Sequence, residues 1–344
     1  MPTPPVQSSS SLDSPCLPDS QCLPPDSPSL VEIKNLSVSF GRGEFLAVKG
    51  VDLELRNGEV VGLVGESGSG KSLTALSLMG LLPYGARLES GLISFLGQEL
   101  TNLSKKGRRE LCGRHMGMVF QEPLTALNPV LTIGDQVSEI FHLRQGLSKN
   151  LAKKAAIDLL HQVGLPNPAQ AAESYPHRFS GGMRQRVVIA MALALNPELV
   201  IADEPTTALD PTIAAQIIWL LREMAQRRKT GVLFITHNLR ILAGLAQRVL
   251  VMYAGSIVEQ TTGDLSQPLH PYTKGLLKAL PPKPSDNLAL RLTPIPGQPP
   301  SPSERFTGCP FQPRCPEIME LCIKELPKMT APAQGRLVRC HRYK

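Results

Sequence analysis

The sequence lacks any apolar run long enough to cross a membrane. Its best candidate, residues 187–195, has nine residues, whereas a spanning helix needs about 20. The first 30 residues also lack the apolar core and the basic start of a secretory signal, because the first basic residue is Lys34. We therefore expect a protein that remains in the cytoplasm and does not span a membrane by itself.

The small number of aromatic residues and the absence of one motif restrict the ligands that we expect this protein to bind. Aromatic residues make up only 4% of the chain, so stacking platforms for single-stranded nucleic acid are not expected, although the net charge of +7 would suit an anionic partner. The guanine-reading pattern Asn-Lys-x-Asp does not occur. The sequence therefore predicts no nucleic acid partner, and it favours ATP over GTP as a nucleotide.

Proline is concentrated at the two ends of the chain. Of 32 prolines, 8 lie in residues 1–30 and 15 lie in residues 268–332. Residues 1–30 combine Pro and Ser with few large apolar residues and cannot offset the entropy of ordering, so we predict a disordered arm there. We place a folded catalytic unit at residues 31–263 and a proline-rich C-terminal extension at residues 264–344.

The hydrophobic pattern of the middle region predicts an α/β fold. Alternating segments near its start predict short antiparallel strands, at residues 31–33, 36–40, 45–48 and 51–55. Continuous apolar runs predict buried parallel strands joined by crossover helices, at residues 59–64, 199–202, 232–236 and 249–252. Helical periodicity between residues 132 and 163 predicts a helical insertion at about residues 122–178.

A phosphate-binding motif follows the first of these buried runs. Residues 65–72 match the pattern G-x-x-x-x-G-K-[ST] between a predicted strand and a predicted helix. The loop amides and the helix N-terminus attract phosphate, Lys71 reaches the β- and γ-phosphates, and the Ser72 hydroxyl binds Mg²⁺. The predicted nucleotide-binding residues of this loop are Gly65, Glu66, Ser67, Gly68, Ser69, Gly70, Lys71 and Ser72.

Two acidic residues end a second apolar run. Asp203 terminates the buried run at residues 199–202, where a carboxylate without a cation would be costly, so we assign it to Mg²⁺. Glu204 follows directly and is placed to polarise the water that attacks the γ-phosphate. A structural salt bridge at a strand end is the alternative role for Glu204.

Residues 179–186 resemble the signature sequence of ATP-binding cassette proteins. Gln121 resembles the Q-loop of that family, Asp210 its D-loop and His237 its switch histidine, all in the family's order. The resemblance spans about residues 31–263. It implies a phosphate-loop ATPase fold, in which a mixed sheet core carries an antiparallel β subdomain and a helical subdomain.

The same resemblance implies a shared ATP site. Two cassettes pair head to tail, so that Ser180, Gly181 and Gly182 of one subunit bind the γ-phosphate held by the other. Gln121 would assist at Mg²⁺ and transmit motion to membrane-spanning partners, and His237 would assist Glu204 in catalysis. We choose Phe40 as the aromatic residue that stacks on adenine, with Phe45 as the second choice.

Two segments resemble one subgroup, the ATPase subunits of oligopeptide and dipeptide importers: Ser-Gly-Gly-Met-Arg-Gln-Arg at residues 180–186 and the segment 267–273. This implies three kinds of partner: a related but distinct second cassette, two permease subunits and an extracytoplasmic peptide-binding protein. It also implies that this chain lies peripherally at the cytoplasmic face of the inner membrane. Importers of nickel or another small solute are the nearest alternative. A soluble cassette protein acting on nucleic acid is less suitable, because it needs a long coiled coil or two cassettes, and a redox sensor is a third alternative.

Four cysteines in the extension have the spacing C-x5-C-x6-C-x17-C. A proline-rich cytoplasmic segment with a poor core suits a metal staple better than disulfides. The resemblance to peptide-importer ATPases implies a [4Fe-4S] cluster, and we expect one that orders the extension without taking part in ATP chemistry. Zn²⁺ with His341 as a substitute ligand, or no metal, are the alternatives. The predicted ligands are Cys309, Cys315, Cys322 and Cys340.

Overall fold

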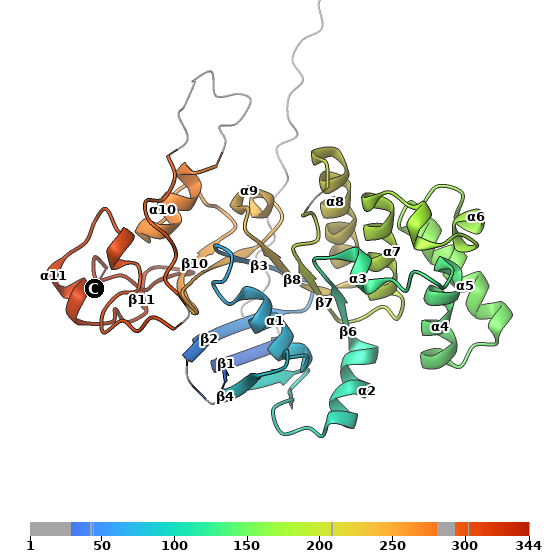
Figure 1. Cartoon of the computed structure of the whole chain (residues 1–344), viewed down its shortest axis with the longest axis horizontal. Coiled ribbons are helices and arrows are strands. Elements are labelled where there is room, and N and C mark those ends of the chain that lie inside the picture. The colour runs from blue at the N-terminus through green and yellow to red at the C-terminus, as the bar shows by residue number, and fades with distance from the viewer. Residues whose placement is uncertain are drawn as a thin grey trace, which may run out of the picture.

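The structure is a computed structural model that describes residues 29–41, 43, 45–207, 209–280, 293–301 and 303–343. The predicted disordered arm therefore lies outside the described residues, except for its last two. The C-terminal extension lies at one end of the molecule, the parallel sheet in the middle and the helical insertion at the other end (Figure 1).

An eight-stranded sheet forms the centre, in the order β11-β12-β10-β9-β3-β8-β7-β6. The five strands from β9 to β6 are parallel, and the other three continue the sheet in antiparallel fashion. The predicted apolar runs form the buried parallel strands. The strand bounds are β3 (Val60–Val64), β6 (Met116–Val119), β7 (Leu199–Asp203), β8 (Gly231–Thr236), β9 (Arg248–Tyr253), β10 (Ser256–Thr262), β11 (Thr330–Ala333) and β12 (Arg336–Val338).

A smaller antiparallel sheet has the order β2-β1-β4-β5. The four short strands predicted here are two strands of 12 residues with bulges, because Asn35 and Gly50 adopt left-handed backbone conformations with φ of 50° and 58°. These bulges interrupt the alternation that the sequence pattern follows. The bounds are β1 (Ser29–Phe40), β2 (Phe45–Arg56), β4 (Ala86–Phe95) and β5 (Gln98–Glu99).

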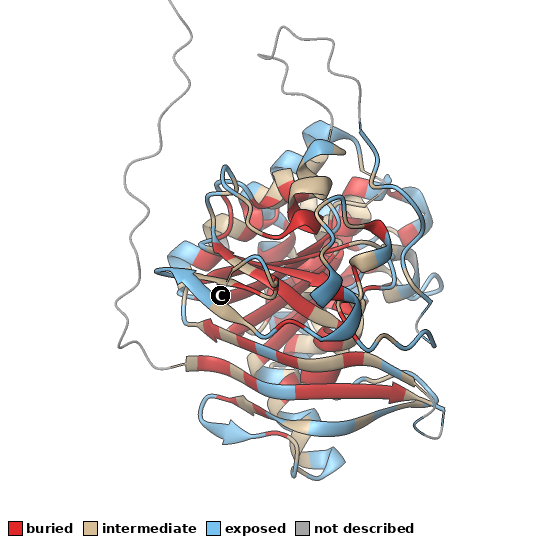
Figure 2. Cartoon of the chain, turned by 90° about the vertical axis from the view of Figure 1, so that its left-hand side faces the viewer, coloured by how far each residue is buried: buried red, intermediate tan, exposed pale blue. Residues whose placement is uncertain are grey.

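The two faces of the central sheet serve different neighbours. On β3, Val60 and Val64 join the core under the helices, whereas Val61 and Leu63 join the core shared with the small sheet and α1 (Lys71–Met79). This is the alternation that a strand buried on both sides requires. Figure 2 shows the buried strands running between the two layers. The remaining cassette helices are α2 (Lys105–His115), α7 (Gly181–Leu193), α8 (Pro211–Arg228) and α9 (Leu239–Leu242).

Helices occupy the predicted insertion. Thr132 caps α4 by accepting a hydrogen bond from the Asp135 N–H at 3.1 Å, and Gly146 ends the helix in a left-handed conformation. No helix in the described ranges has both the length and the apolar character needed to cross a membrane. The insertion consists of α3 (Pro123–Ala126), α4 (Ile133–Gln145), α5 (Lys149–Gln162), α6 (Pro168–Ala172) and the 3₁₀ helix η1 (Pro176–Arg178).

The C-terminal extension joins the central sheet. Strand β12 pairs with β10 through Glu259 opposite Val338 and Gln260 opposite Leu337. The boundary predicted near residue 263 thus separates two strands that hydrogen-bond to each other. The segment around Tyr272 is helical, and β11 and β12 were not predicted. The extension also holds α10 (Pro271–Lys278), the 3₁₀ helix η2 (Gln312–Arg314) and α11 (Glu320–Lys324).

Gly91 is required where β4 crosses the bulge of β1. Its φ is +107°, and a Cβ there would lie 2.6 Å from the Leu36 Cα. We predict that Gly91→Ala lowers the free energy of unfolding by about 2 to 4 kcal/mol, because backbone must move. Gly97→Ala is the control, since φ is +75° but no atom lies within 4 Å of the added Cβ. Urea unfolding should show a smaller loss of about 1 kcal/mol for the control, and equal losses would contradict the steric argument.

Candidate active site

The phosphate loop connects β3 to α1 and is closely packed at its first and last glycines, whereas Ser67 and Gly68 in its middle are exposed. A Cβ on Gly65 would lie 2.2 Å from the Met252 carbonyl oxygen, and one on Gly70 would lie 2.9 Å from the Ala47 carbonyl oxygen. Gly70 also has a φ of 106° at the N-cap of α1. The glycines therefore let the loop pass close to neighbouring backbone and enter the helix whose N-terminus faces the phosphate position.

Lys71 lies over the loop with its charge buried. Its Nζ donates to the carbonyl oxygens of Gly65 and Glu66, both at 2.9 Å. Burial lowers the pKa of Lys71, while the carboxylates of Glu204, Asp203 and Glu66 act in the opposite direction. A bound phosphate would give this ammonium group the charged partner that the loop carbonyls do not provide.

Asp203 and Ser72 meet at the end of β7 as a site suited to Mg²⁺. Asp203 is 6% exposed, and its Oδ1 has no hydrogen-bond partner in the structure. Burial raises the pKa of Asp203, and a hydrogen bond with Ser72 lowers it. An orphaned buried carboxylate oxygen beside a hydroxyl fits a hard cation that prefers oxygen ligands. Gln121 lies two residues beyond Val119, which pairs with Ala202 of β7. Its backbone is therefore at the same edge of the sheet as Asp203, but its side chain is exposed.

Glu204 and His237 are brought together from the ends of β7 and β8. The Glu204 Oε2 lies 3.1 Å from His237 Nδ1 and accepts from the Thr207 hydroxyl at 2.8 Å. The Glu204 N–H donates to the Ile235 carbonyl oxygen at 2.9 Å, and its backbone has a φ of 46°. The carboxylate is thus fixed in orientation. Sequence reasoning missed Thr207, whose only signal was its place three residues after Glu204.

The signature residues lie at the start of α7. Ser180 caps the helix by accepting from the Met183 N–H at 3.3 Å, and both Ser180 and Gly181 are exposed. A Cβ on Gly182 would lie 2.6 Å from Ile213 of α8. Asp210 caps α8 by accepting from the Ile213 N–H at 2.9 Å. The signature and the D-loop are therefore adjacent, and no hydrogen bond among the described residues joins them to this chain's own phosphate loop.

Phe40 and Phe45 form a stacked pair. Their ring centroids are 5.8 Å apart with an interplanar angle of 18°, because the residues pair where β1 ends and β2 begins. Strand β2 then passes the phosphate loop at Ala47. Both rings chosen for adenine stacking thus lie together, two residues before the loop contact.

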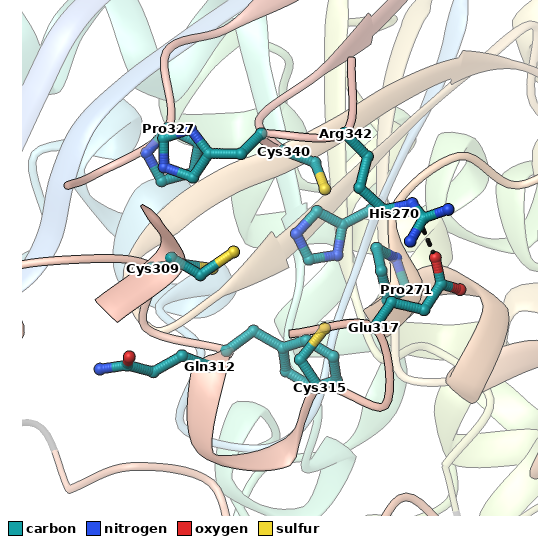
Figure 3. A pocket seen from close by; sticks show the side chains of 12 residues that line it. His270, Pro271, Cys309, Gln312, Cys315, Glu317, Pro327, Cys340 and Arg342 are labelled. Carbon is teal, nitrogen blue, oxygen red and sulfur yellow. Dashed lines mark ion pairs between the residues drawn. The ribbon is translucent and has the colours of Figure 1, made fainter. Parts of the chain in front are cut away.

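The four C-terminal cysteines line one small cavity. Figure 3 shows the thiols of Cys309, Cys315 and Cys340 directed toward a common space, and Cys322 also lines it. Burial raises the pKa of the Cys309 thiol to about 11, with smaller contributions from the three other thiols. All four are free thiols. Within the described ranges, no group of three or more His, Cys, Asp or Glu residues is arranged to hold a metal ion, so the predicted cluster lacks that support.

A groove of about 990 Å³ lies where α2, β6, α4 and α7 meet. Its lining combines apolar side chains, such as Phe120 and Leu143, with a set of basic ones. Leu143 is 67% exposed. This combination of exposed apolar surface and positive charge is typical of a protein interface. The basic lining residues are Lys105, Arg108, Arg109, Arg114 and Arg144.

Two residues of the extension contact the phosphate loop, and sequence reasoning missed both. Tyr272 accepts a hydrogen bond from the Glu66 N–H at 2.8 Å, and Arg314 forms an ion pair with the Glu66 carboxylate at 2.7 Å. Tyr272 lies in the segment 267–273 that resembles peptide-importer ATPases, but nothing in the sequence connects it or Arg314 with Glu66, which precedes them by 206 and 248 residues. The loop is therefore supported by the extension as well as by the cassette.

Comparison with known proteins agrees with this geometry. A family model described as "ABC transporter" matches residues 48–207, and one described as "Oligopeptide/dipeptide transporter, C-terminal region" matches residues 259–322. A solved dimeric ATP-binding cassette in a post-hydrolysis state, bound to ADP and phosphate, superposes with a TM-score of 0.62 at 28% identity. It covers 68% of this chain and 99% of its own.

Curated relatives match over nearly the whole length. The dipeptide transport ATP-binding protein DppD of Escherichia coli (strain K12) is 47% identical over 319 residues, which is 91% of this chain and 96% of the relative. The oligopeptide transport ATP-binding protein AppD of Bacillus subtilis (strain 168) is 45% identical over 320 residues, 92% of this chain and 97% of the relative. The expected cassette fold is confirmed, and the chain belongs to the ATP-binding cassette family, in the group of oligopeptide and dipeptide transporter ATP-binding proteins.

Proposed function

We propose that this protein is the ATP-hydrolysing subunit of a membrane transporter that imports dipeptides or oligopeptides. The observation that carries the proposal is the presence, in one chain, of a complete set of cassette motifs and the C-terminal region of peptide transporters. Import of nickel or another small solute is the alternative, because related cassettes serve it, but relatives that match over more than 90% of this chain are named for peptides.

In the proposed reaction each group of site residues has its own role. The loop amides and Lys71 bind the phosphates, and the Phe40–Phe45 pair stacks on adenine. Mg²⁺, held by Ser72, Asp203 and Gln121, would neutralise charge on the transferred phosphoryl group. Glu204, held by His237 and Thr207, orients the attacking water and accepts its proton.

Two exposed surfaces of this chain support the proposed partner subunits. The exposed Ser180 and Gly181 would complete the ATP site of a second, related but distinct cassette. The basic, partly apolar groove would receive a segment of one of two membrane permease subunits, which would place this chain peripherally at the cytoplasmic face of the inner membrane. An extracytoplasmic binding protein would deliver the peptide to the complex.

We also propose a [4Fe-4S] cluster at the four cysteines. Its support is that four thiols from separate segments surround one cavity in the extension. A Zn²⁺ site with His341 as a substitute ligand is the alternative. Ligation would also require the thiols to lose protons that burial favours keeping.

We predict that Glu204→Gln traps ATP in the assembled transporter. Removing the carboxylate that orients water should reduce hydrolysis at least about 100-fold, while ATP affinity changes less than about threefold. Peptide uptake into vesicles that contain the complex should stop in parallel. Lys71→Ala is the contrasting variant, because it should weaken ATP binding itself. Near-normal turnover by Glu204→Gln would reject the assignment, and ATP turnover without peptide uptake would favour another solute.

A second prediction tests the shared site. Ser180→Arg should abolish turnover of the complex, because the added side chain would occupy the space of the γ-phosphate held by the partner cassette. ATP binding by the isolated subunit should persist, since no hydrogen bond among the described residues joins Ser180 to this chain's own loop. Fluorescence titration with an ATP analogue measures that binding. Unchanged turnover of the complex would contradict the shared-site arrangement.

A third prediction concerns the cysteines. Protein purified without oxygen should be brown and contain about four irons per chain, because a four-thiolate [4Fe-4S] site requires that number. Cys315→Ser should lose the colour and make the extension more sensitive to proteases. Colourless protein with stoichiometric zinc would replace the cluster with a zinc site. Absence of both metals would reject ligation.

A further inference from the structure

The extension holds Glu66 of the phosphate loop by both its side chain and its backbone. Arg314 donates to the two carboxylate oxygens of Glu66, from Nη1 at 2.7 Å and from Nη2 at 2.9 Å. The Glu66 N–H donates to the Tyr272 hydroxyl at 2.8 Å. Three hydrogen bonds from distant parts of the chain therefore converge on one loop residue.

Arg314 is itself held from several sides. Its side chain is only 4% exposed, and its Nε donates to the Pro296 carbonyl oxygen at 3.0 Å. The guanidinium also donates to the Tyr253 hydroxyl at 3.3 Å and lies 5.8 Å from the centre of that ring. A bidentate arginine–carboxylate pair is short and directional, and burial shields it from water and salt. Arg314 can therefore fix the orientation of Glu66.

Tyr272 is fixed by aromatic packing. It is fully buried, with its ring centroid 4.6 Å from that of Tyr253 and 5.4 Å from that of Phe311. Its position at the start of α10 is set by its own N–H, which donates to His270 Nδ1 at 3.0 Å. Ring packing of this kind leaves the hydroxyl little freedom, so the acceptor for the Glu66 N–H is preorganised.

Glu66 continues this chain of contacts to Lys71. The carbonyl oxygen of Glu66 accepts from Lys71 Nζ at 2.9 Å, as does that of Gly65. The residue held by Arg314 and Tyr272 therefore also holds the lysine that binds phosphate. Displacement of Glu66 would move both the loop backbone and the lysine.

We infer that Arg314 and Tyr272 are positioning residues for ATP binding, through which the extension sets the affinity of the phosphate loop for ATP. Their hydrogen bonds to the loop go to Glu66, and they act by holding that residue. The inference rests on the proposed function only in that the loop binds ATP for hydrolysis. It concerns Arg314 and Tyr272 alone, and the expectation that a cluster at the cysteines takes no part in ATP chemistry stays a prediction.

The test uses Arg314→Met and Tyr272→Phe in the full chain assembled with its partner subunits. Both variants should raise the KM for ATP about 10-fold, or about 1.4 kcal/mol, while kcat changes less than about twofold. Titration with a fluorescent ATP analogue should show the same loss. The double variant Arg314→Met, Glu66→Gln should bind ATP no more weakly than Arg314→Met alone. Both substitutions remove the same interaction, the pair between Arg314 and Glu66.

Two matched controls separate positioning from general stability. Arg248 forms a similar two-point pair with Glu59 at the opposite end of β3, with distances of 2.6 and 3.0 Å. Tyr343 donates from its hydroxyl to the Leu269 carbonyl oxygen at 3.2 Å, within the extension. Arg248→Met and Tyr343→Phe should lower the thermal unfolding temperature but leave the KM for ATP within about twofold of the original.

The outcomes are distinct. An equal rise in KM in the control variants, or an unchanged KM in Arg314→Met and Tyr272→Phe, would overturn the inference. Should Arg314→Met fail to fold, Tyr272→Phe decides alone, because it removes a single hydroxyl. Absence of ATP turnover in the unsubstituted complex would instead reject the proposed function.

Discussion

The phosphate loop can bind ATP only while its backbone amides point at one place, and the neighbouring backbone enforces this. The Met252 carbonyl fills the space beside Gly65, and the Ala47 carbonyl fills the space beside Gly70. The Gly255 N–H donates to the Ser69 carbonyl oxygen at 3.0 Å. Strands of both sheets therefore meet at the loop, and the order of the strands serves to bring them there.

The same site carries an electrostatic cost before ATP arrives. Burial lowers the pKa of Lys71 and raises that of Asp203, so each charged form is disfavoured by its surroundings. Among the described residues, none forms a hydrogen bond with the Asp203 Oδ1. In the proposed function, a magnesium nucleotide would supply phosphate to the lysine and a cation to the aspartate, so binding would relieve both costs together.

The sequence was informative where function depends on short, continuous segments. The phosphate loop, the apolar run before Asp203 and the helical periodicity after residue 132 all appear locally, and the structure has the expected elements there. The full length of β1 and β2 was not predicted, because the bulges at Asn35 and Gly50 break the alternation of apolar and polar residues. Strands β11 and β12 have only four and three residues, too few for a periodic signal. The division at residue 263 stays a prediction.

Arg314 and Tyr272 could not be found from the sequence, since each is a single residue whose partner lies over 200 positions away. Arg314 also lies in the same turn as residues that line the cysteine cavity or pack on Tyr272. Within one short turn, Phe311 packs on Tyr272, Arg314 pairs with Glu66 and Cys315 lines the cysteine cavity. The Arg314 N–H donates to the Phe311 carbonyl oxygen at 3.0 Å, which keeps the turn compact. The cysteine cavity and the inferred support of the phosphate loop therefore share one turn of the chain.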